Sequence, residues 1–266
     1  MASPTTCFIT GTDTGVGKTV LTALLLQHLL RRGERVLAFK PFATGSRADA
    51  LLLRRVLRAC ASNSSDRVAA ESPTIADLSP FFFRRPLAPW VAARLEGRRV
   101  TRAQALAAIR AWQNTDRLLL VEGCGGLLTP LGPGYSAREL IQELACPVVI
   151  VARNRLGVLN QTLLAWEALG GAGGPAAAVV LMNCARPDAS APTNPRALAG
   201  CVAPTPVLVC PHLRGGLRTP AELVAAGQKT APLLARLTRT LEYHRSRTGG
   251  FVTRADKKRS AFANSG

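Results

Sequence analysis

A loop near the amino terminus carries residue types that bind phosphate. It combines glycines, threonines and one lysine, and it reads Gly11-Thr12-Asp13-Thr14-Gly15-Val16-Gly17-Lys18-Thr19. In such a loop, backbone N–H groups and the N terminus of the following helix face the phosphates, the Lys18 ammonium reaches the β and γ oxygens, and the Thr19 hydroxyl ligates Mg²⁺. The first glycine lies one residue earlier than in the usual GxxxxGK[ST] pattern, in which Thr12 would be Gly. The loop predicts a site for ATP and Mg²⁺ at Gly15, Val16, Gly17, Lys18 and Thr19.

Lysine is rare in the chain, and this rarity makes two positions informative. Of the 34 basic residues only 5 are Lys, and Lys18 and Lys40 are the only lysines before residue 229. A compact ammonium fits between phosphate oxygens where a planar guanidinium does not. We therefore expect Lys40, at the end of the second predicted strand, to point into the same crevice as the loop.

Two carboxylates lie at the boundaries of predicted elements. Glu122 ends a buried apolar run and precedes a glycine loop, where a carboxylate is costly unless it is paired with a metal or a cation. Asp49 lies at the start of a predicted helix, where the helix dipole alone would favour a carboxylate.

Short β-rich runs alternate with amphipathic segments along most of the chain. Strands are predicted over 6–10, 36–40, 117–121, 147–151, 176–182 and 207–210, and helices over 18–32, 48–61, 101–114, 136–144, 158–169 and 220 to about 244. Repeated βα units form parallel sheets with right-handed crossovers. The sequence therefore predicts a single-domain α/β P-loop fold, a mostly parallel β-sheet with helices on both faces. Residues 62–89 are expected to form loops and a short helix, and residues 186–206 read as a Gly/Pro/Ala-rich stretch.

Length and composition limit the class of protein. With 266 residues, 47% of them hydrophobic, we expect residues 1–244 to form one domain and residues 245–266 to form a basic, disordered tail. No apolar run is long enough for a membrane span, and residues 1–6 lack the features of a secretory signal, so a soluble, cytoplasmic protein is expected. The seven cysteines form no CxxC pair, which indicates neither a disulfide framework nor a zinc site.

The net charge of +18 by itself suggests an anionic partner such as nucleic acid. The arginines are spread along the whole chain, however, with no interleaved aromatic run that would stack bases. A bias toward Arg in the coding sequence explains the charge as well, and nucleic-acid binding is therefore not expected.

Three motifs in order resemble the dethiobiotin synthetase family: the loop, Lys40-Pro41-Phe42-Ala43-Thr44-Gly45 and Val121-Glu122-Gly123-Cys124-Gly125-Gly126. Further similar segments, which extend the resemblance over residues 5 to 240, are Ser79-Pro80-Phe81 through Glu96-Gly97-Arg98, Thr129-Pro130-Leu131, Leu156-Gly157-Val158-Leu159-Asn160 and Val180-Leu181-Met182-Asn183. The resemblance implies an ATP-dependent ring closure. In it, 7,8-diaminopelargonic acid takes up CO₂ as a carbamate, ATP phosphorylates the carbamate, and the second amine displaces phosphate.

The resemblance also implies roles for single residues. Lys40 becomes the catalytic lysine beside Lys18, and the Mg²⁺ ligands are Thr19, Asp49 and Glu122. Asp49 follows a loop that is shorter than the family's usual one. Further nucleotide contacts are implied for Gly123, Cys124, Gly125, Asn183, Pro211, His212 and Leu213. Substrate contacts are implied for Thr14 and Thr44 and, from the other subunit of a homodimer, for Leu156, Gly157 and Asn160. Arg153 and Arg155 flank this last segment and are candidates either to strengthen carboxylate binding or to lie in a solvated loop.

Three alternatives stay open. An amide-forming synthetase of the cobyrinate type shares the fold, although the residues after the last predicted helix are too few for the glutamine-hydrolysing domain that such enzymes carry. A regulatory or nucleic-acid-binding P-loop ATPase would suit the charge, although Asp13 stands where the partitioning ATPases carry their signature lysine. A degraded paralogue with weak activity would suit the short loop before Asp49 and the enrichment in Arg.

Overall fold

The computed structural model describes residues 6–61, 73–113, 117–213, 215 and 217–247. Its centre is a six-stranded sheet in which every pair of neighbours is parallel. In spatial order the strands are β2 (Val36–Phe39), β5 (Leu118–Glu122), β1 (Thr6–Gly11), β6 (Val148–Asn154), β7 (Ala176–Asn183) and β8 (Val207–Cys210). The predicted parallel sheet is confirmed. Because all six strands run the same way, the segments that follow them meet at one edge.

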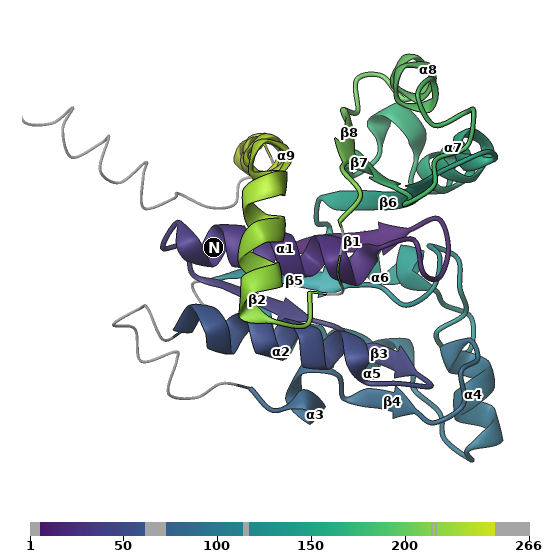
Figure 1. The fold of residues 1–266 in the computed structure, drawn as a ribbon. Coiled ribbons are helices and arrows are strands. Elements are labelled where there is room, and N and C mark those ends of the chain that lie inside the picture. The colour runs from purple at the N-terminus through teal and green to yellow at the C-terminus, as the bar shows by residue number, and fades with distance from the viewer. Residues whose placement is uncertain (1–5, 62–72, 114–116, 214, 216, 248–266) are drawn as a thin grey trace, which may run out of the picture.

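Helices cover both faces of this sheet, and two buried clusters fill the space between the layers. Leucines of α1 (Lys18–Arg31) and α9 (Pro220–Arg247), with Leu53 and Val56 of α2 (Ala48–Ala61), pack on one face. Figure 1 shows α1 and α9 together on that side. The other cluster takes in residues of α4 (Pro89–Leu95), α5 (Arg102–Gln113), α6 (Ala137–Leu144), α7 (Val158–Ala168) and α8 (Asn194–Cys201).

Several short elements differ from the sequence prediction, and the strand Phe42–Thr44 is one that it did not contain. Phe81–Phe83, expected to be a loop, forms β4 and pairs in parallel with β3 (Phe42–Thr44), and the rings of Phe42 and Phe81 lie 5.0 Å apart. Helix α4 was not predicted, and α8 lies inside the Gly/Pro/Ala-rich stretch. The short helix expected in the first loop region is α3 (Ile75–Leu78), and a 3₁₀ turn, η2 (Gly171–Gly173), follows α7.

The last helix runs to Arg247, slightly beyond its expected end. The remainder of the predicted basic tail, residues 248–266, lies outside the described residues, as do residues 62–72 of the predicted loop. Within the described ranges, no helix is both long and apolar enough to cross a bilayer.

A capping box fixes the start of α6, the helix that follows the glycine loop after β5. Ser136 Oγ accepts a hydrogen bond from the Arg138 N–H at 3.2 Å, and the Glu139 carboxylate accepts from the Ser136 N–H at 2.7 Å. Burial raises the pKa of Glu139, but hydrogen bonds from Ser136 and Arg138 outweigh it and lower that pKa to about 2.

We predict that Ser136→Ala lowers the free energy of unfolding at neutral pH by about 1 kcal/mol, the usual cost of losing an N-cap. A carboxylate whose pKa is lower in the folded state than in the unfolded state stabilises the fold at pH values above its unfolded pKa. It loses that effect as the pH falls toward its folded pKa. The difference in the free energy of unfolding between the wild type and Ser136→Ala should therefore narrow below pH 4.5. Urea denaturation at several pH values measures this, and equal stability at neutral pH would contradict the assignment.

Candidate active site

The functional side chains come from the ends of three neighbouring strands. Lys40 directly follows β2, Glu122 is the last residue of β5, and the glycine loop follows β1. Since β5 lies between β2 and β1, these side chains converge on one stretch of the sheet edge. This is the crevice where open parallel sheets bind their ligands.

A buried ion pair joins the first two strand ends. The Lys40 Nζ donates a hydrogen bond to Glu122 Oε1 at 2.6 Å, and the two residues are 4% and 1% exposed. The same ammonium lies 2.9 Å from Asp49 Oδ2, in the first turn of α2. The Thr19 hydroxyl donates to Glu122 Oε1 at 2.6 Å. The structure thus brings together all three oxygen donors that the sequence nominated as metal ligands, Asp49 included.

The protonation of this cluster follows from burial and charge. Burial alone would lower the pKa of Lys40, but the carboxylates of Glu122 and Asp49 outweigh it and raise that pKa above its ordinary value. Burial raises the pKa of Asp49, yet the nearby Lys40 ammonium and a hydrogen bond from Thr19 hold it below its ordinary value. Lys40 is therefore an ammonium, and Asp49 a carboxylate, at neutral pH.

Lys18, the first residue of α1, brings a second ammonium to the same place. Its Nζ donates to the carbonyl oxygens of Asp13 at 2.8 Å and Gly125 at 2.7 Å. Burial and the neighbouring Lys40 lower the pKa of Lys18. Gly17 holds the turn before α1 at φ 107°, and a Cβ there would lie 3.0 Å from the Met182 side chain, so only glycine suits this position.

A cavity of about 690 Å³ opens over these groups. Its wall includes Lys18, Lys40, Glu122 and eight further residues that the sequence nominated: Thr14, Gly15, Gly17, Thr19, Thr44, Asp49, Cys124 and Gly125. Gly123 is not part of this wall, but its carbonyl oxygen accepts a hydrogen bond from Lys40 Nζ at 3.5 Å. The candidate catalytic and metal-binding residues therefore share one cavity.

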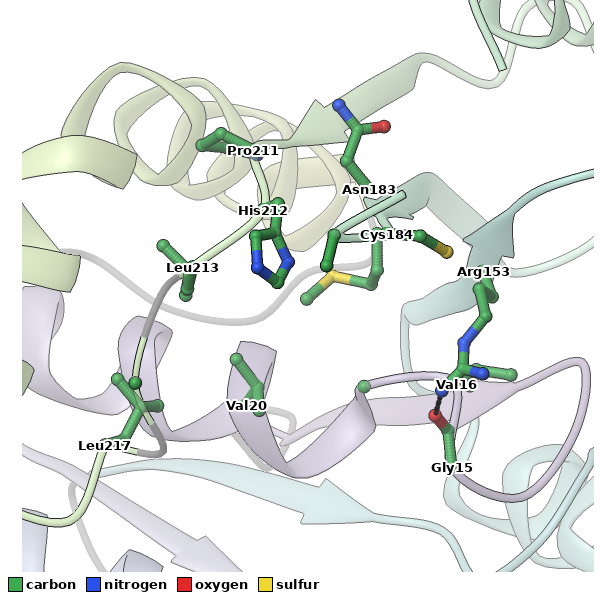
Figure 2. Close-up of a pocket in the computed structure, with 14 residues that line it drawn as sticks. Gly15, Val16, Val20, Arg153, Asn183, Cys184, Pro211, His212, Leu213 and Leu217 are labelled. Atoms are coloured by element: carbon green, nitrogen blue, oxygen red, sulfur yellow. Dashed lines mark hydrogen bonds between the residues drawn. The ribbon is translucent and has the colours of Figure 1, made fainter. Parts of the chain in front are cut away.

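A second cavity, of about 440 Å³, lies on the other side of the loop. It is lined by Gly15, Val16, Gly17, Asn183, Pro211, His212 and Leu213, all of them predicted nucleotide contacts. Figure 2 shows Asn183, Pro211 and His212 across this cavity from Gly15 and Val16. Gly15, Gly17 and Val20 line both cavities, so a nucleotide can place its base in one and its phosphates in the other.

Sequence reasoning missed the residues that orient Asn183. Asn154, the last residue of β6, donates its amide hydrogen to Asn183 Oδ1 at 2.9 Å, and its own Oδ1 accepts from Asn194 Nδ2 at 3.0 Å. Asn154 and Asn194 are both buried. With its oxygen engaged, Asn183 presents its NH₂ group as the donor. The only signal in the sequence was a polar residue at the end of an apolar strand.

Three predicted substrate residues lie elsewhere. Leu156, Gly157 and Asn160 line neither cavity. Gly157 caps the N terminus of α7 at φ 90°, Leu156 is 80% exposed, and the Leu156 N–H already donates to the Asp188 carboxylate at 2.8 Å. Within one chain, this segment is therefore separate from the Lys18 and Lys40 cluster.

The oxygen donors suit a hard divalent cation. Glu122 Oε2 is buried and has no hydrogen-bond partner among the described residues, although Oε1 has two. A buried carboxylate oxygen without a partner is costly, and a cation would satisfy it. Among the described residues, no group of three or more His, Cys, Asp or Glu side chains is placed so that it could hold a metal ion. A magnesium ion that keeps waters and takes phosphate ligands needs no such cluster.

A protein-family model described as an AAA domain matches residues 5–214. The ATP-dependent dethiobiotin synthetase BioD of Bacillus subtilis (strain 168) is 36% identical over 194 residues, which cover 71% of this chain and 79% of the relative. The enzyme of the same name from Anaeromyxobacter sp. (strain Fw109-5) is 38% identical over 212 residues, covering 78% of this chain and 90% of the relative. This chain belongs to the dethiobiotin synthetase family. The resemblance predicted from the motifs is confirmed.

Solved structures support the fold at larger distance. A ParA family ATPase from Chlorobium tepidum TLS superposes with a TM-score of 0.51 and 13% identity, covering 91% of this chain and 98% of that one. At this identity the likeness shows the P-loop α/β fold alone. This is the fold class that the sequence predicted for this member of the dethiobiotin synthetase family, and it is confirmed.

We predict that Lys40→Met destabilises the protein by about 3 to 5 kcal/mol in the absence of metal, because Glu122 then keeps a buried charge without its cation. The double variant Lys40→Met/Glu122→Gln should recover part of this loss, since two neutral side chains then replace the buried ion pair. Guanidinium denaturation in the presence of EDTA measures the free energy of unfolding of the single and the double variant. A Lys40→Met protein as stable as the wild type would contradict the pairing.

Proposed function

We propose that this chain catalyses the ATP- and Mg²⁺-dependent closing of the ring of dethiobiotin from 7,8-diaminopelargonic acid and CO₂. The observation that carries the proposal is the convergence of Lys18, Lys40 and Glu122 on one cavity that adjoins the nucleotide cavity across the glycine loop. Family membership supports the same reaction, because the relatives are named ATP-dependent dethiobiotin synthetases.

The reaction has three steps. One amine of the diamine adds to CO₂ and loses a proton, which gives a carbamate. A carbamate oxygen attacks the γ-phosphorus of ATP and ADP leaves, which gives a carbamic-phosphoric anhydride. The second amine attacks the carbamate carbon and loses a proton as phosphate departs, which closes the cyclic urea. No step needs a nucleophile from the protein, so Cys124 receives no covalent role.

The chemical obstacle is the approach of two anions, the carbamate and the γ-phosphate. We propose that Lys18 and Lys40 supply the positive charge that permits it, as in other phosphoryl transfers. Lys40 already donates to Glu122 and Asp49. When a phosphate or carbamate oxygen replaces one of these two carboxylates, the Lys40 ammonium keeps a negatively charged partner during the whole reaction. A bound Mg²⁺, held by Thr19, Asp49 and Glu122, would neutralise charge on the phosphate oxygens.

The remaining roles follow from the two cavities. Thr14 and Thr44, on the wall of the larger cavity, are proposed to hydrogen-bond the amines or the carbamate. The Asn183 amide is proposed to donate to the edge of the adenine ring, with Pro211, His212 and Leu213 as the opposite wall. Gly123, Cys124 and Gly125 let backbone approach the phosphates closely.

We also propose that the working unit is a homodimer. The exposed Leu156, Asn160 and Leu164 recur every four residues, so they share one side of α7 and the turn before it. Leu164 is 63% exposed. A second copy would cover the two exposed leucines and would present the N terminus of its α7 to the carboxylate of the substrate.

The proposed compartment is the cytoplasm. A reducing compartment suits the six free thiols of Cys60, Cys124, Cys146, Cys184, Cys201 and Cys210.

The test of the reaction is phosphate release from ATP and Mg²⁺ with and without 7,8-diaminopelargonic acid and bicarbonate, with mass analysis of the product. We expect release only with the diamine, together with a product of the mass of dethiobiotin. Phosphate release that does not depend on the diamine, or no phosphate release from a protein that binds ATP, would contradict the proposed function.

We predict that Lys40→Arg lowers the turnover number roughly 100-fold, since misplacement of a catalytic charge by about an ångström costs that much. Its affinity for ADP should change little, because the charge is kept and the loop is untouched. Lys18→Ala is the matched comparison, and it should abolish tight ADP binding. Calorimetry and steady-state kinetics separate the two, and an unchanged rate in Lys40→Arg would remove Lys40 from the catalytic role.

We predict that Leu164→Asp converts a dimer to a monomer and lowers diamine-dependent phosphate release, while ADP binding is retained. Leu95→Asp is the control, because Leu95 is 54% exposed at the end of α4. Light scattering measures the mass of both. A Leu164→Asp dimer with full activity would place the subunit contact elsewhere.

A further inference from the structure

Arg153 lies at the edge of the nucleotide cavity and touches the phosphate-binding loop. It belongs to β6, and its Nη2 donates a hydrogen bond to the carbonyl oxygen of Gly15 at 2.7 Å. Figure 2 shows the guanidinium reaching from the strand to the loop. This placement differs from both sequence expectations for Arg153, because the side chain faces the nucleotide cavity rather than the segment that starts α7.

Two paired strand positions hold the loop. Arg153 of β6 stands opposite Met182 of β7 in the parallel register. Met182 packs against Gly17, and Arg153 bonds to Gly15. A Cβ built on Gly15 would meet nothing within 4 Å, so the loop is open beside the guanidinium, whereas at Gly17 it is closed by Met182. A ligand that follows the loop from one cavity to the other passes this open position.

The Arg153 guanidinium has no anionic partner among the described residues. Arg153 is exposed, and its remaining guanidinium N–H groups bond to none of the described residues. Among the described residues that line the cavity, none carries a carboxylate. A guanidinium fork can donate to a carbonyl with one nitrogen and to a phosphate oxygen with another.

We propose that Arg153 binds the phosphate chain of the nucleotide from the β6 side of the loop, while Lys18 binds it from within the loop. The ligand class is a nucleoside di- or triphosphate, and the inference rests on the nucleotide site of the proposed function. Arg153 is a nucleotide-binding residue with two contacts: one nitrogen fixes the Gly15 carbonyl and the others meet phosphate oxygen.

The test is calorimetric titration of ADP into the wild type and the variants Arg153→Ala, Arg153→Gln and Arg153→Lys, with adenosine measured by competition. A lost charge-assisted hydrogen bond weakens binding roughly tenfold or more. We expect Arg153→Ala to bind ADP roughly tenfold more weakly than the wild type does, and to bind adenosine with unchanged affinity. Arg153→Lys should recover part of the affinity. Arg153→Gln should not, because it can donate to Gly15 but carries no charge.

Arg155→Ala is the matched control, since Arg155 is also exposed, lies two residues further on and lines neither cavity. It removes the same net charge and should leave ADP affinity unchanged. Wild-type affinity in Arg153→Gln would reduce Arg153 to a support of the loop and overturn the proposal. Unchanged affinity in Arg153→Ala, or an equal loss for adenosine, would overturn it too. Failure of the ring-closing reaction would be visible separately, as ADP binding without diamine-dependent phosphate release.

Discussion

An ammonium and a carboxylate lie 2.6 Å apart where almost no solvent reaches, Lys40 directly after β2 and Glu122 at the end of β5. Either charge alone would be costly at this depth, so the two strand ends must be in register for the fold to hold both. The parallel pairing of Phe39 with Val121, one residue before each partner, supplies that register. Lys18, Thr19 and Asp49 then surround a pair that the sheet has already placed.

The same arrangement prepares the site for anions. Two lysines at the sheet edge face carboxylates and carbonyl oxygens that a phosphate can replace, and Glu122 keeps one buried oxygen without a partner among the described residues. A site with such groups already in place needs little reorganisation when charge moves between substrates. On the far side of the loop, Asn154 holds Asn183 in one orientation, which fixes the base end of the ligand while the lysines receive its phosphates.

Much of this could be predicted from the sequence, because long periodic segments and a loop between strand and helix carry strong local signals. Short elements could not. A strand of three residues such as Phe81–Phe83 shows no period, and its partner Phe42 is distant in the chain. Helix α8 has a single buried leucine, Leu198, among small residues. The Asn154 and Asn194 contacts depend on which strand ends meet, which only the tertiary structure reveals. The partner of Asp49 was ambiguous for the same reason, since a helix N terminus alone would suit a carboxylate.

The central claim is that both ammonium groups and a metal ion converge on the terminal phosphate in the larger cavity. A crystal structure with Mn²⁺ and a non-hydrolysable ATP analogue tests it most directly, because anomalous scattering locates the metal. We predict Mn²⁺ roughly 2.0 to 2.5 Å from the Thr19 hydroxyl and a Glu122 oxygen, with a γ-phosphate oxygen in hydrogen-bond reach of both Lys18 and Lys40. A γ-phosphate outside that cavity, with Lys40 still held by Glu122 and Asp49, would contradict it.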